Sequence, residues 1–362
     1  MNAKITPVQL SMLIITYIGI SNHVLLIPVL LDTVHRDAWI SVLFAIVPSL
    51  LIALLYVYMY KQIPSSLTSW VKEKTNLLVW LTFTLLFTLY FLLQAAISIR
   101  DTVIWSNSSY LTYTPPWIVS ISLISICYYT ARKGLVAIAI TNGILLPWII
   151  VFGFSIMIVN FQFKDYSFLF PVFKNSAQSI TKGTWYTASG ITEIFIVFFL
   201  KDDLKGKLTN KNMLLVVLIL IELTFGPLSG VIAIFGPFEA AMLRFPAYEQ
   251  WRMASIGSMI SQIDFLSIYQ WLAGSFIRIS LAIYILHTLW VEKWQHPEIL
   301  FILISLFLFL INQFKLSDIK FHEYIKFYYT SSSLLCGATS AVLLICIWVG
   351  KNRKSVKQDG SN

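Results

Sequence analysis

The residues best suited to chemistry in this chain lie in two short interruptions of long apolar stretches. The first interruption is Gly19-Ile20-Ser21-Asn22-His23, and the second is Gly190-Ile191-Thr192-Glu193. Each unpaired backbone group at membrane depth costs roughly several kcal/mol unless it lines a cavity or a polar site. Two interrupted stretches in separate halves of a chain are typical of a central binding site in transporter-like folds.

These interruptions suit the binding of a small zwitterion. The N-terminus of a half-helix carries partial positive charge and free N–H groups, which suit a carboxylate. Freed carbonyl groups at the opposite end suit an ammonium group or a metal cation. Gly19 and Gly190 would let the backbone approach the ligand closely. Tyr90 and Gln94 share one helix face that could line the pocket, although ordinary packing between helices explains Tyr90 equally well.

Four titratable residues fall within apolar stretches, where an ionisable group is costly and suggests a function. Glu193 could anchor a ligand amine, a cation or a proton, or it could fix the interrupted helix end by hydrogen bonding. Glu222 could gate the segment around Gly226-Pro227 or pair with Arg278, and we favour a structural Glu222–Arg278 bridge. Arg278 could also snorkel toward the cytoplasmic face. For His23 we favour a role as N-terminal cap of the second half-helix over a role in the cavity.

Catalysis and metal binding have little support in the sequence. It contains no GxSxG, no HExxH, no glycine-rich phosphate loop and no carboxylate pair on one helix face. We therefore expect no enzyme, no cofactor and no metal. Cys127, Cys336 and Cys346 fall in predicted spans without a CxxC pair, and we interpret them as small buried hydrophobes.

The composition places all these residues in a membrane protein that crosses the bilayer many times. The 362 residues are 57% hydrophobic and 12% charged, against roughly 45–50% and 25% in soluble domains. The net charge of +9 is spread over short loops, which argues against a nucleic-acid partner. Ten spans are predicted, near 8–31, 38–60, 77–99, 116–131, 134–159, 184–200, 212–234, 258–287, 297–314 and 330–350.

The interruptions fall in the first and sixth predicted spans, which predicts an inverted repeat of five plus five helices. We expect one transmembrane domain over 1–350, with halves near 1–160 and 180–350, and a disordered basic tail over 351–362. The strongest basic clusters, at 201–211 and 351–357, predict that both termini are cytoplasmic. The predicted fold class is an all-α integral membrane protein with helices one and six broken.

Several segments together resemble the membrane-permease-like B subunit of bacterial endospore germinant receptors, the spore permease family. The order and spacing of these segments carry the resemblance over nearly the whole chain. They are Ile5-Thr6-Pro7-Val8-Gln9-Leu10, Asp37-Ala38-Trp39-Ile40-Ser41, Phe168-Leu169-Phe170-Pro171-Val172-Phe173, and Phe245-Pro246-Ala247-Tyr248-Glu249-Gln250 through Ser255-Ile256-Gly257 and Ile263-Asp264 to Trp271.

The resemblance implies an amino acid–polyamine–organocation transporter fold, similar to LeuT. It also implies a nutrient sensor in the spore inner membrane that works with a larger A subunit and a C-subunit lipoprotein. Its ligand pocket would lie around residues 19–23, 190–193 and Tyr90. Ser21-Asn22-His23 stands where the family often has small residues, so alanine is not assumed as the ligand. Ser261-Gln262 also replaces an acidic-basic pair, and Arg278 has no counterpart in the family pattern.

Three functions remain open from the sequence. The leading hypothesis is a receptor subunit that binds a small nutrient, expected to be an amino acid, and triggers spore germination. The alternative is an amino-acid permease of the same fold. A third hypothesis is an assembly or ion-conducting component that binds no nutrient.

Overall fold

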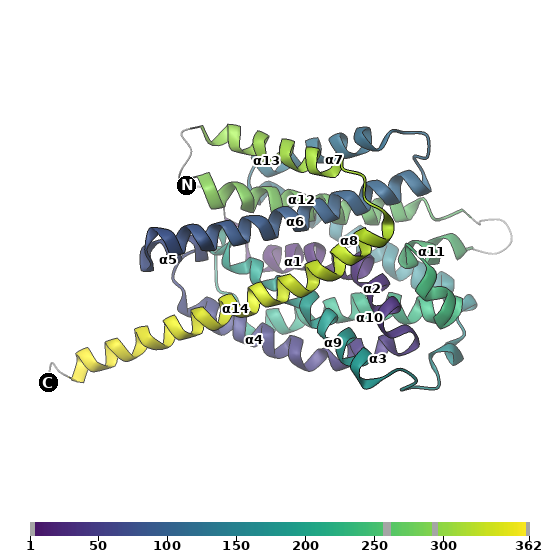
Figure 1. Ribbon diagram of the computed structural model, residues 1–362, viewed down its shortest axis with the longest axis horizontal. Helices are drawn as coiled ribbons and strands as arrows, with labels where there is room; N and C mark the ends of the chain where they lie inside the picture. Colours follow the sequence, from purple (N-terminus) through teal and green to yellow (C-terminus); the bar gives the residue numbers. More distant parts are fainter. Residues whose placement is uncertain (1–3, 256–261, 292–295, 360–362) are drawn as a thin grey trace.

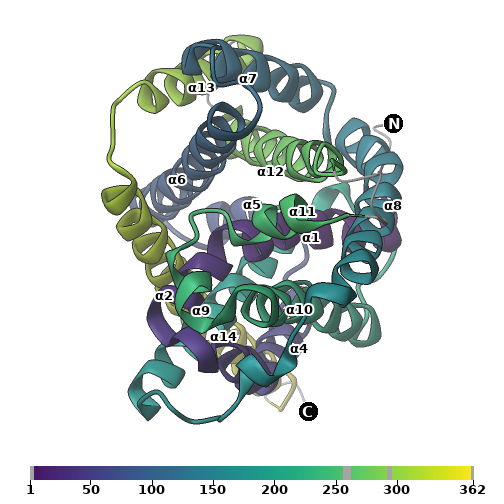
Figure 2. The same cartoon turned by 90° about the vertical axis from the view of Figure 1, so that its right-hand side faces the viewer.

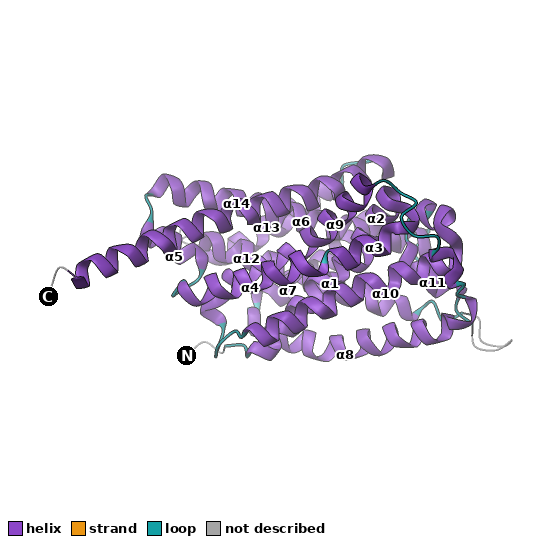
Figure 3. Ribbon diagram, turned by 90° about the horizontal axis from the view of Figure 1, so that it is seen from below, coloured by secondary structure: helices purple, strands orange, loops and turns teal. Residues whose placement is uncertain are grey.

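The computed structural model describes residues 4–255, 262–291 and 296–359. Every regular element in these ranges is helical, as Figure 3 shows, which confirms the predicted all-α architecture. The α-helices are α1 (Pro7–Ser21), α2 (Ile27–Val34), α3 (Ala38–Phe44), α4 (Ile46–Gln62), α5 (Leu67–Lys74), α6 (Leu77–Ser109), α7 (Pro116–Arg132), α8 (Leu135–Val159), α9 (Ala177–Thr192), α10 (Asn210–Met242), α11 (Pro246–Met253), α12 (Leu266–Trp290), α13 (Pro297–Asn312) and α14 (Asp318–Asp359). Two short non-α segments complete the interrupted spans, the π-helix η1 (Asn22–Leu26) and the 3₁₀-helix η5 (Glu193–Phe198).

Each of the ten predicted ranges contains helix, but fewer helices pass as membrane spans by length and apolarity alone. Within the described residues there are 6, or up to 7 if α4 and α5, bent by 57°, form one span. The ten crossings and the inverted repeat therefore remain predictions. The start of the span predicted at 258–287 lies partly outside the described residues, and α12 begins at Leu266.

The last helix differs most from its prediction. Polar residues such as Lys320 and Lys326 end the apolar run near residue 330, yet α14 begins earlier, at Asp318. It also continues through the predicted tail to Asp359 and extends beyond the bundle (Figure 1). Lys, Arg and Gln are good helix formers, so a basic tail need not leave the helix.

The first interrupted span lies in the middle of the bundle. Figure 2 shows α1 between α10 and α12, and α1 also packs against α8. In the run Pro7–Phe44, 83% of the most apolar window is buried, against 28% in α6. The first span therefore faces other helices, whereas much of α6 is available to lipid.

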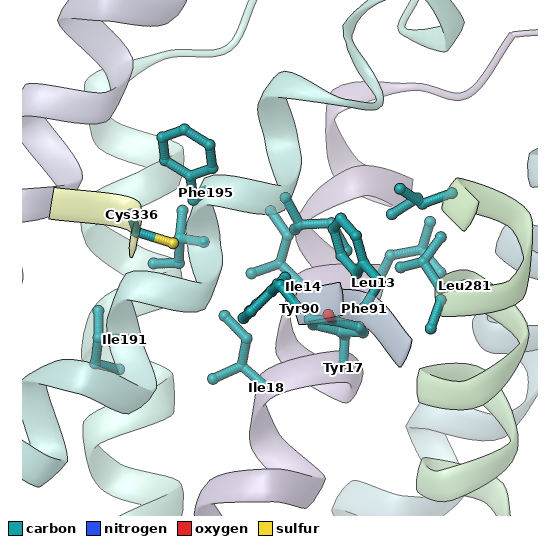
Figure 4. Packing of buried hydrophobic residues seen from close by; sticks show 14 of the residues in the cluster. Leu13, Ile14, Tyr17, Ile18, Tyr90, Phe91, Ile191, Phe195, Leu281 and Cys336 are labelled. Atoms are coloured by element: carbon teal, nitrogen blue, oxygen red, sulfur yellow. The ribbon is translucent and has the colours of Figure 1, made fainter. Parts of the chain in front are cut away.

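The core joins both interrupted spans to three other helices, α6, α12 and α14. Phe195 of η5 stacks on Phe87 of α6, with ring centroids 5.5 Å apart. Figure 4 shows part of the buried cluster, with side chains from α1, α6, α9, η5, α12 and α14: Leu13, Ile14, Tyr17, Ile18, Tyr90, Phe91, Ile191, Phe195, Leu281 and Cys336. The interrupted segments thus lie within a packed interior.

Two segments that carry the family resemblance bind each other at one end of the bundle. Asp37, which is fully buried, accepts hydrogen bonds from the backbone N–H groups of Phe173 (3.0 Å) and Asn175 (2.7 Å). Asn175 Nδ2 donates a further bond to the same carboxylate over 3.1 Å. This carboxylate holds the loop ahead of α9 against the start of α3.

The segment that follows η5 ties together several elements at the other end. Ile5 and Leu204 form an isolated parallel β-bridge, with hydrogen bonds from Ile5 N to Asp203 O (2.9 Å) and from Lys205 N to Ile5 O (2.8 Å). Lys201 donates to the carbonyl groups of Tyr60 and Ile63 near the end of α4. Tyr284 of α12 donates to the Asp203 carboxylate over 2.9 Å. Residues 201–205 therefore connect the chain start, α4 and α12.

The packing of α9 predicts a test of the fold. A Cβ atom on Gly183 would lie 2.6 Å from both Ser41 Oγ and Val34 Cγ2. We expect Gly183→Ala to lower the free energy of unfolding by about 1–3 kcal/mol, because α9 must move away from α2 and α3. The matched control is Gly143→Ala in α8, where an added Cβ meets nothing within 4 Å. Thermal unfolding followed by tryptophan fluorescence in detergent would separate the variants, and equal stability would contradict this packing.

Candidate functional site

Both interruptions remain helical, so the free half-helix ends expected from the sequence are absent. In the first, α1 ends at Ser21 and η1 continues it as a π-helix into α2. In the second, α9 ends at Thr192 and η5 continues as a 3₁₀-helix. A wider or tighter helix keeps its backbone groups paired in apolar surroundings, which an unwound segment cannot do. Short π-helical turns occur frequently at functional sites.

His23 is not the predicted cap. The residue at the N-cap of α2 is Leu26, and it makes no side-chain cap. The His23 ring instead points across to α10, with Nδ1 3.4 Å from the carbonyl oxygen of Leu223. The continuous helix explains the error, since η1 leaves no free N–H groups there for a cap to satisfy.

The two interruptions touch each other. Gly190 lies directly against Asn22, because a Cβ atom on Gly190 would lie 2.4 Å from Asn22 Oδ1. Asn22 is fully buried, and within the described residues neither atom of its side-chain amide has a hydrogen-bond partner. Gly19 faces Leu223, and Ile20 packs on Gly274 of α12. The two glycines allow close contact with side chains of other helices, and the predicted close approach of a ligand to them stays a prediction.

Glu193 forms a buried ion pair with Arg278. The Arg278 Nη1 to Glu193 Oε2 distance is 2.6 Å, and both side chains are at most 1% exposed. The predicted Glu222–Arg278 bridge is therefore wrong, since Glu222 is exposed on α10. Arg278 also does not snorkel. A buried guanidinium needs a buried carboxylate, and η5 provides one.

Every N–H group of Arg278 has an acceptor. A guanidinium has five N–H donors, and here they reach four different elements. Nε donates to Ser98 Oγ (3.1 Å); Nη1 donates to Tyr17 O (2.5 Å) and Glu193 Oε2; Nη2 donates to Glu193 Oε1 (3.1 Å) and Tyr328 Oη (3.1 Å). Tyr328 in turn donates to Glu193 Oε1 over 2.8 Å. In this arrangement the pair joins α1, α6, η5, α12 and α14 and has no donor left for a ligand.

Two tyrosines of α14, absent from the predicted site, join its parts. Tyr328 stacks on Tyr90 with ring centroids 6.0 Å apart, and the Tyr329 hydroxyl lies 2.9 Å from Ser21 Oγ. The apolar run ends near residue 330, so hydropathy placed both tyrosines outside the last span. Ile191 is part of the hydrophobic core, and Thr192 Oγ1 donates to the carbonyl of Ser189.

A small cavity lies beside the first interruption. Its volume is about 10 Å³, room for about one water molecule. The lining residues come from the first span, α6 and α12: Ile20, Ser21, Val24, Leu25, Ser98, Asp101, Trp271, Ser275 and Arg278. The residues of the second interruption and Tyr90 do not line it. Of the residues predicted to bind a ligand, only Ile20 and Ser21 therefore border this small space.

Three polar lining residues, Ser98, Asp101 and Ser275, were not predicted. A signal for two of them existed, because Ser98 and Asp101 extend the helix face predicted from Tyr90 and Gln94 by successive turns. Gln94 is fully buried, and its amide has no hydrogen-bond partner within the described residues. Within the part of the chain that the structure describes, no group of three or more His, Cys, Asp or Glu side chains could hold a metal ion.

Comparison with known proteins identifies the family. The model of the family described as spore germination protein, or spore permease, matches residues 4–319. The chain belongs to this family. This spore permease is 34% identical over 349 residues to spore germination protein XB of Bacillus anthracis, covering 96% of the chain and 98% of that protein. The resemblance seen in the sequence is thereby confirmed.

The fold is shared with a solved transporter. The spore permease matches Mhp1, a nucleobase-cation-symport-1 family transporter in a closed conformation with bromovinylhydantoin bound, with a TM-score of 0.59. The alignment covers 94% of this chain and 77% of Mhp1 at 10% identity, so it shows the fold alone. Family and fold together support a membrane protein of the permease or transporter class rather than an enzyme.

The buried ion pair predicts a stability test. Arg278→Leu leaves the Glu193 carboxylate buried without its cation, and we expect a loss of about 3–5 kcal/mol in the free energy of unfolding. The double variant Glu193→Leu with Arg278→Leu removes both charges and should recover most of that loss. The amount of protein in membranes and its thermal unfolding in detergent provide the measurement. Arg278→Leu as stable as the parent would contradict the conclusion that the Glu193–Arg278 pair stabilises the bundle.

Proposed function

We propose that this spore permease is the membrane subunit of a nutrient germinant receptor. It binds a small nutrient, expected to be an amino acid, in a pocket between the first interruption, α6 and α12, and the binding triggers germination. The observation that carries this proposal is the polar cavity beside Ser21 in a spore germination family member of transporter fold. Its neighbour Asn22 contacts Gly190, which links the pocket to the second interruption.

Binding acts by favouring one of two arrangements of the interrupted helices. The cavity has room for about one water molecule, so a nutrient binds only to a wider arrangement and shifts the population toward it. The π-helix η1 supplies a place for this change, because short π-helical turns inside α-helices occur frequently at functional sites. A contact that joins η1 to α9 at Asn22 and Gly190 passes the change to the second half.

Membership of the spore germination family supports a receptor setting. We infer that the subunit lies in the spore inner membrane and works with a germinant receptor A subunit and a C-subunit lipoprotein. Both termini face the cytoplasm in this proposal, which the basic clusters at 201–211 and 351–357 support. The five-plus-five repeat, with halves near 1–160 and 180–350, is part of the same proposal, and the likeness to the Mhp1 fold supports it.

The second candidate is a permease that moves an amino acid across the membrane. The likeness to Mhp1, a transporter solved with a ligand bound, favours it. Uptake of a labelled amino-acid mixture into vesicles that contain the isolated subunit separates the two functions. Robust uptake would contradict a purely sensory role, whereas a nutrient response in spores without uptake in vesicles supports the receptor.

The contact between the interruptions predicts the effect of one methyl group. Gly190→Ala places a Cβ atom 2.4 Å from Asn22 Oδ1, which disrupts the contact that passes the change from η1 to α9. In spores carrying this receptor alone, we expect the nutrient concentration for half-maximal germination to rise about tenfold or more, equivalent to roughly 1.4 kcal/mol. The screen uses each amino acid separately, followed by loss of optical density.

The matched control is Gly337→Ala in α14, where an added Cβ meets nothing within 4 Å. It should respond as the parent does, and immunoblots of spore membranes should show equal amounts of the parent and of the two variants. A normal response of Gly190→Ala would show that the contact between the interruptions has no part in sensing.

A further inference from the structure

Asp101 is a buried carboxylate that the central ion pair does not use. It lines the cavity, and its side chain is only 4% exposed. Its polar contact within the described residues is a single one, from Arg244 Nη2 to Asp101 Oδ1 over 3.3 Å. An ionised carboxylate has about four acceptor positions on its two oxygens. Asp101 therefore lines the cavity and retains unused acceptor positions.

The other charged groups near the cavity, Arg278 and Glu193, are engaged in the central ion pair. Arg278 also lines it, but its five donors are all bound. Glu193 accepts from both Arg278 and Tyr328. A ligand cation that enters the cavity thus meets unused acceptor positions at Asp101, whereas Glu193 does not line the cavity.

A second unpartnered group in the same cavity is a donor. Trp271 lines the cavity and is 5% exposed, and its indole Nε1 has no hydrogen-bond partner within the described residues. Its ring is fixed by stacking on Trp105, with centroids 4.4 Å apart. One cavity therefore combines a carboxylate that accepts with a buried N–H that donates, which matches a molecule carrying an ammonium group and an acceptor oxygen.

We propose that Asp101 binds the ammonium group of the ligand in competition with Arg244, so that the ligand is a small primary amine such as an amino acid. This assignment rests on the proposed nutrient-binding function and names the ligand class and the residue that selects it. It assigns amine binding to α6 and not to Glu193, for which a ligand amine was one of several roles that the sequence left open.

Arg244 is suited to exchange. Its side chain is 28% exposed, in contrast to Asp101. Its guanidinium also lies over the rings of Phe245 (4.6 Å) and Phe321 (5.4 Å), so it keeps favourable contacts after it leaves the carboxylate. A ligand ammonium group gives Asp101 a shorter, charge-assisted hydrogen bond than the present 3.3 Å contact.

The exchange of Arg244 for the ligand amine also affects α11, which packs against Trp271 in the cavity wall. Arg244 lies in the short connection between α10 and α11, and α11 contributes Tyr248 and Trp251 to an aromatic cluster that contains Trp271. Figure 2 shows α11 crossing the end of the bundle in front of α1. Release of Arg244 from Asp101 thus loosens the segment that packs on the cavity wall.

The ligand class is tested first with paired probes. Spores carrying this receptor and its partner subunits are exposed to each of the common L-amino acids and to the matching α-hydroxy acid, for example L-alanine beside L-lactate. We expect germination with at least one amino acid and none with its hydroxy counterpart, since only the amine can replace Arg244. A hydroxy acid as effective as its amino acid would overturn the assignment.

The residue is tested with Asp101→Asn, Arg244→Gln and the double variant. Asp101→Asn should raise the half-maximal concentration of the effective amino acid about tenfold or more, while Arg244→Gln should lower it because the competing cation is gone. The double variant should keep the defect of Asp101→Asn. If the two residues form only a structural pair, both single variants are impaired and the double variant recovers, which would overturn the proposal.

Two readouts keep the outcomes distinct. Immunoblots of spore membranes report accumulation, and the double variant, which leaves no unpaired buried charge, remains informative if a single variant fails to accumulate. A parent receptor that responds to no probe contradicts the proposed function and this assignment with it. A parent that responds while Asp101→Asn accumulates and responds normally overturns the assignment alone.

Discussion

An apolar bundle must satisfy every charge that it contains, and in this protein that constraint falls on Arg278. Its guanidinium is buried and binds groups from α1, α6, η5 and α14 while standing on α12. Removing any of these partners leaves a polar group in surroundings that cannot solvate it. The second interruption carries the matching carboxylate, Glu193, so η5 must lie where this carboxylate can pair with Arg278.

The two interruptions solve the same problem for the backbone. They stay helical, one as a π-helix and the other as a 3₁₀-helix, and so pair their backbone groups within the helix. The polar groups that lack hydrogen-bond partners in this region belong to side chains. The amides of Asn22 and Gln94 are buried without partners within the described residues. Unpaired buried amides are costly, so an arrangement that admits a ligand or water to them gains free energy that offsets the loss of close packing.

Much of this was predictable from the sequence, and the remainder has physical reasons. Hydropathy located the interrupted spans, and the cost of buried charge singled out Glu193, Arg278 and Glu222. Helix periodicity fixes which residues share a face but not which faces meet, so Arg278 was paired with the wrong glutamate. Hydropathy also ended the last span near residue 330 and missed Tyr328 and Tyr329, because polar residues on the same helix lowered the average. Of the family segments, Ser255-Ile256-Gly257 extends beyond the described residues at 256–257.

The β-bridge between Ile5 and Leu204 has a practical meaning for work on the living spore. It connects Ile5, just ahead of α1, to residues 203–205, a few residues after η5, so the two interrupted spans are linked outside the core as well. A fluorescent protein or epitope joined ahead of Ile5 would lie beside this connection and could disturb it. One joined after α14, which extends clear of the bundle in Figure 1, would lie away from this connection.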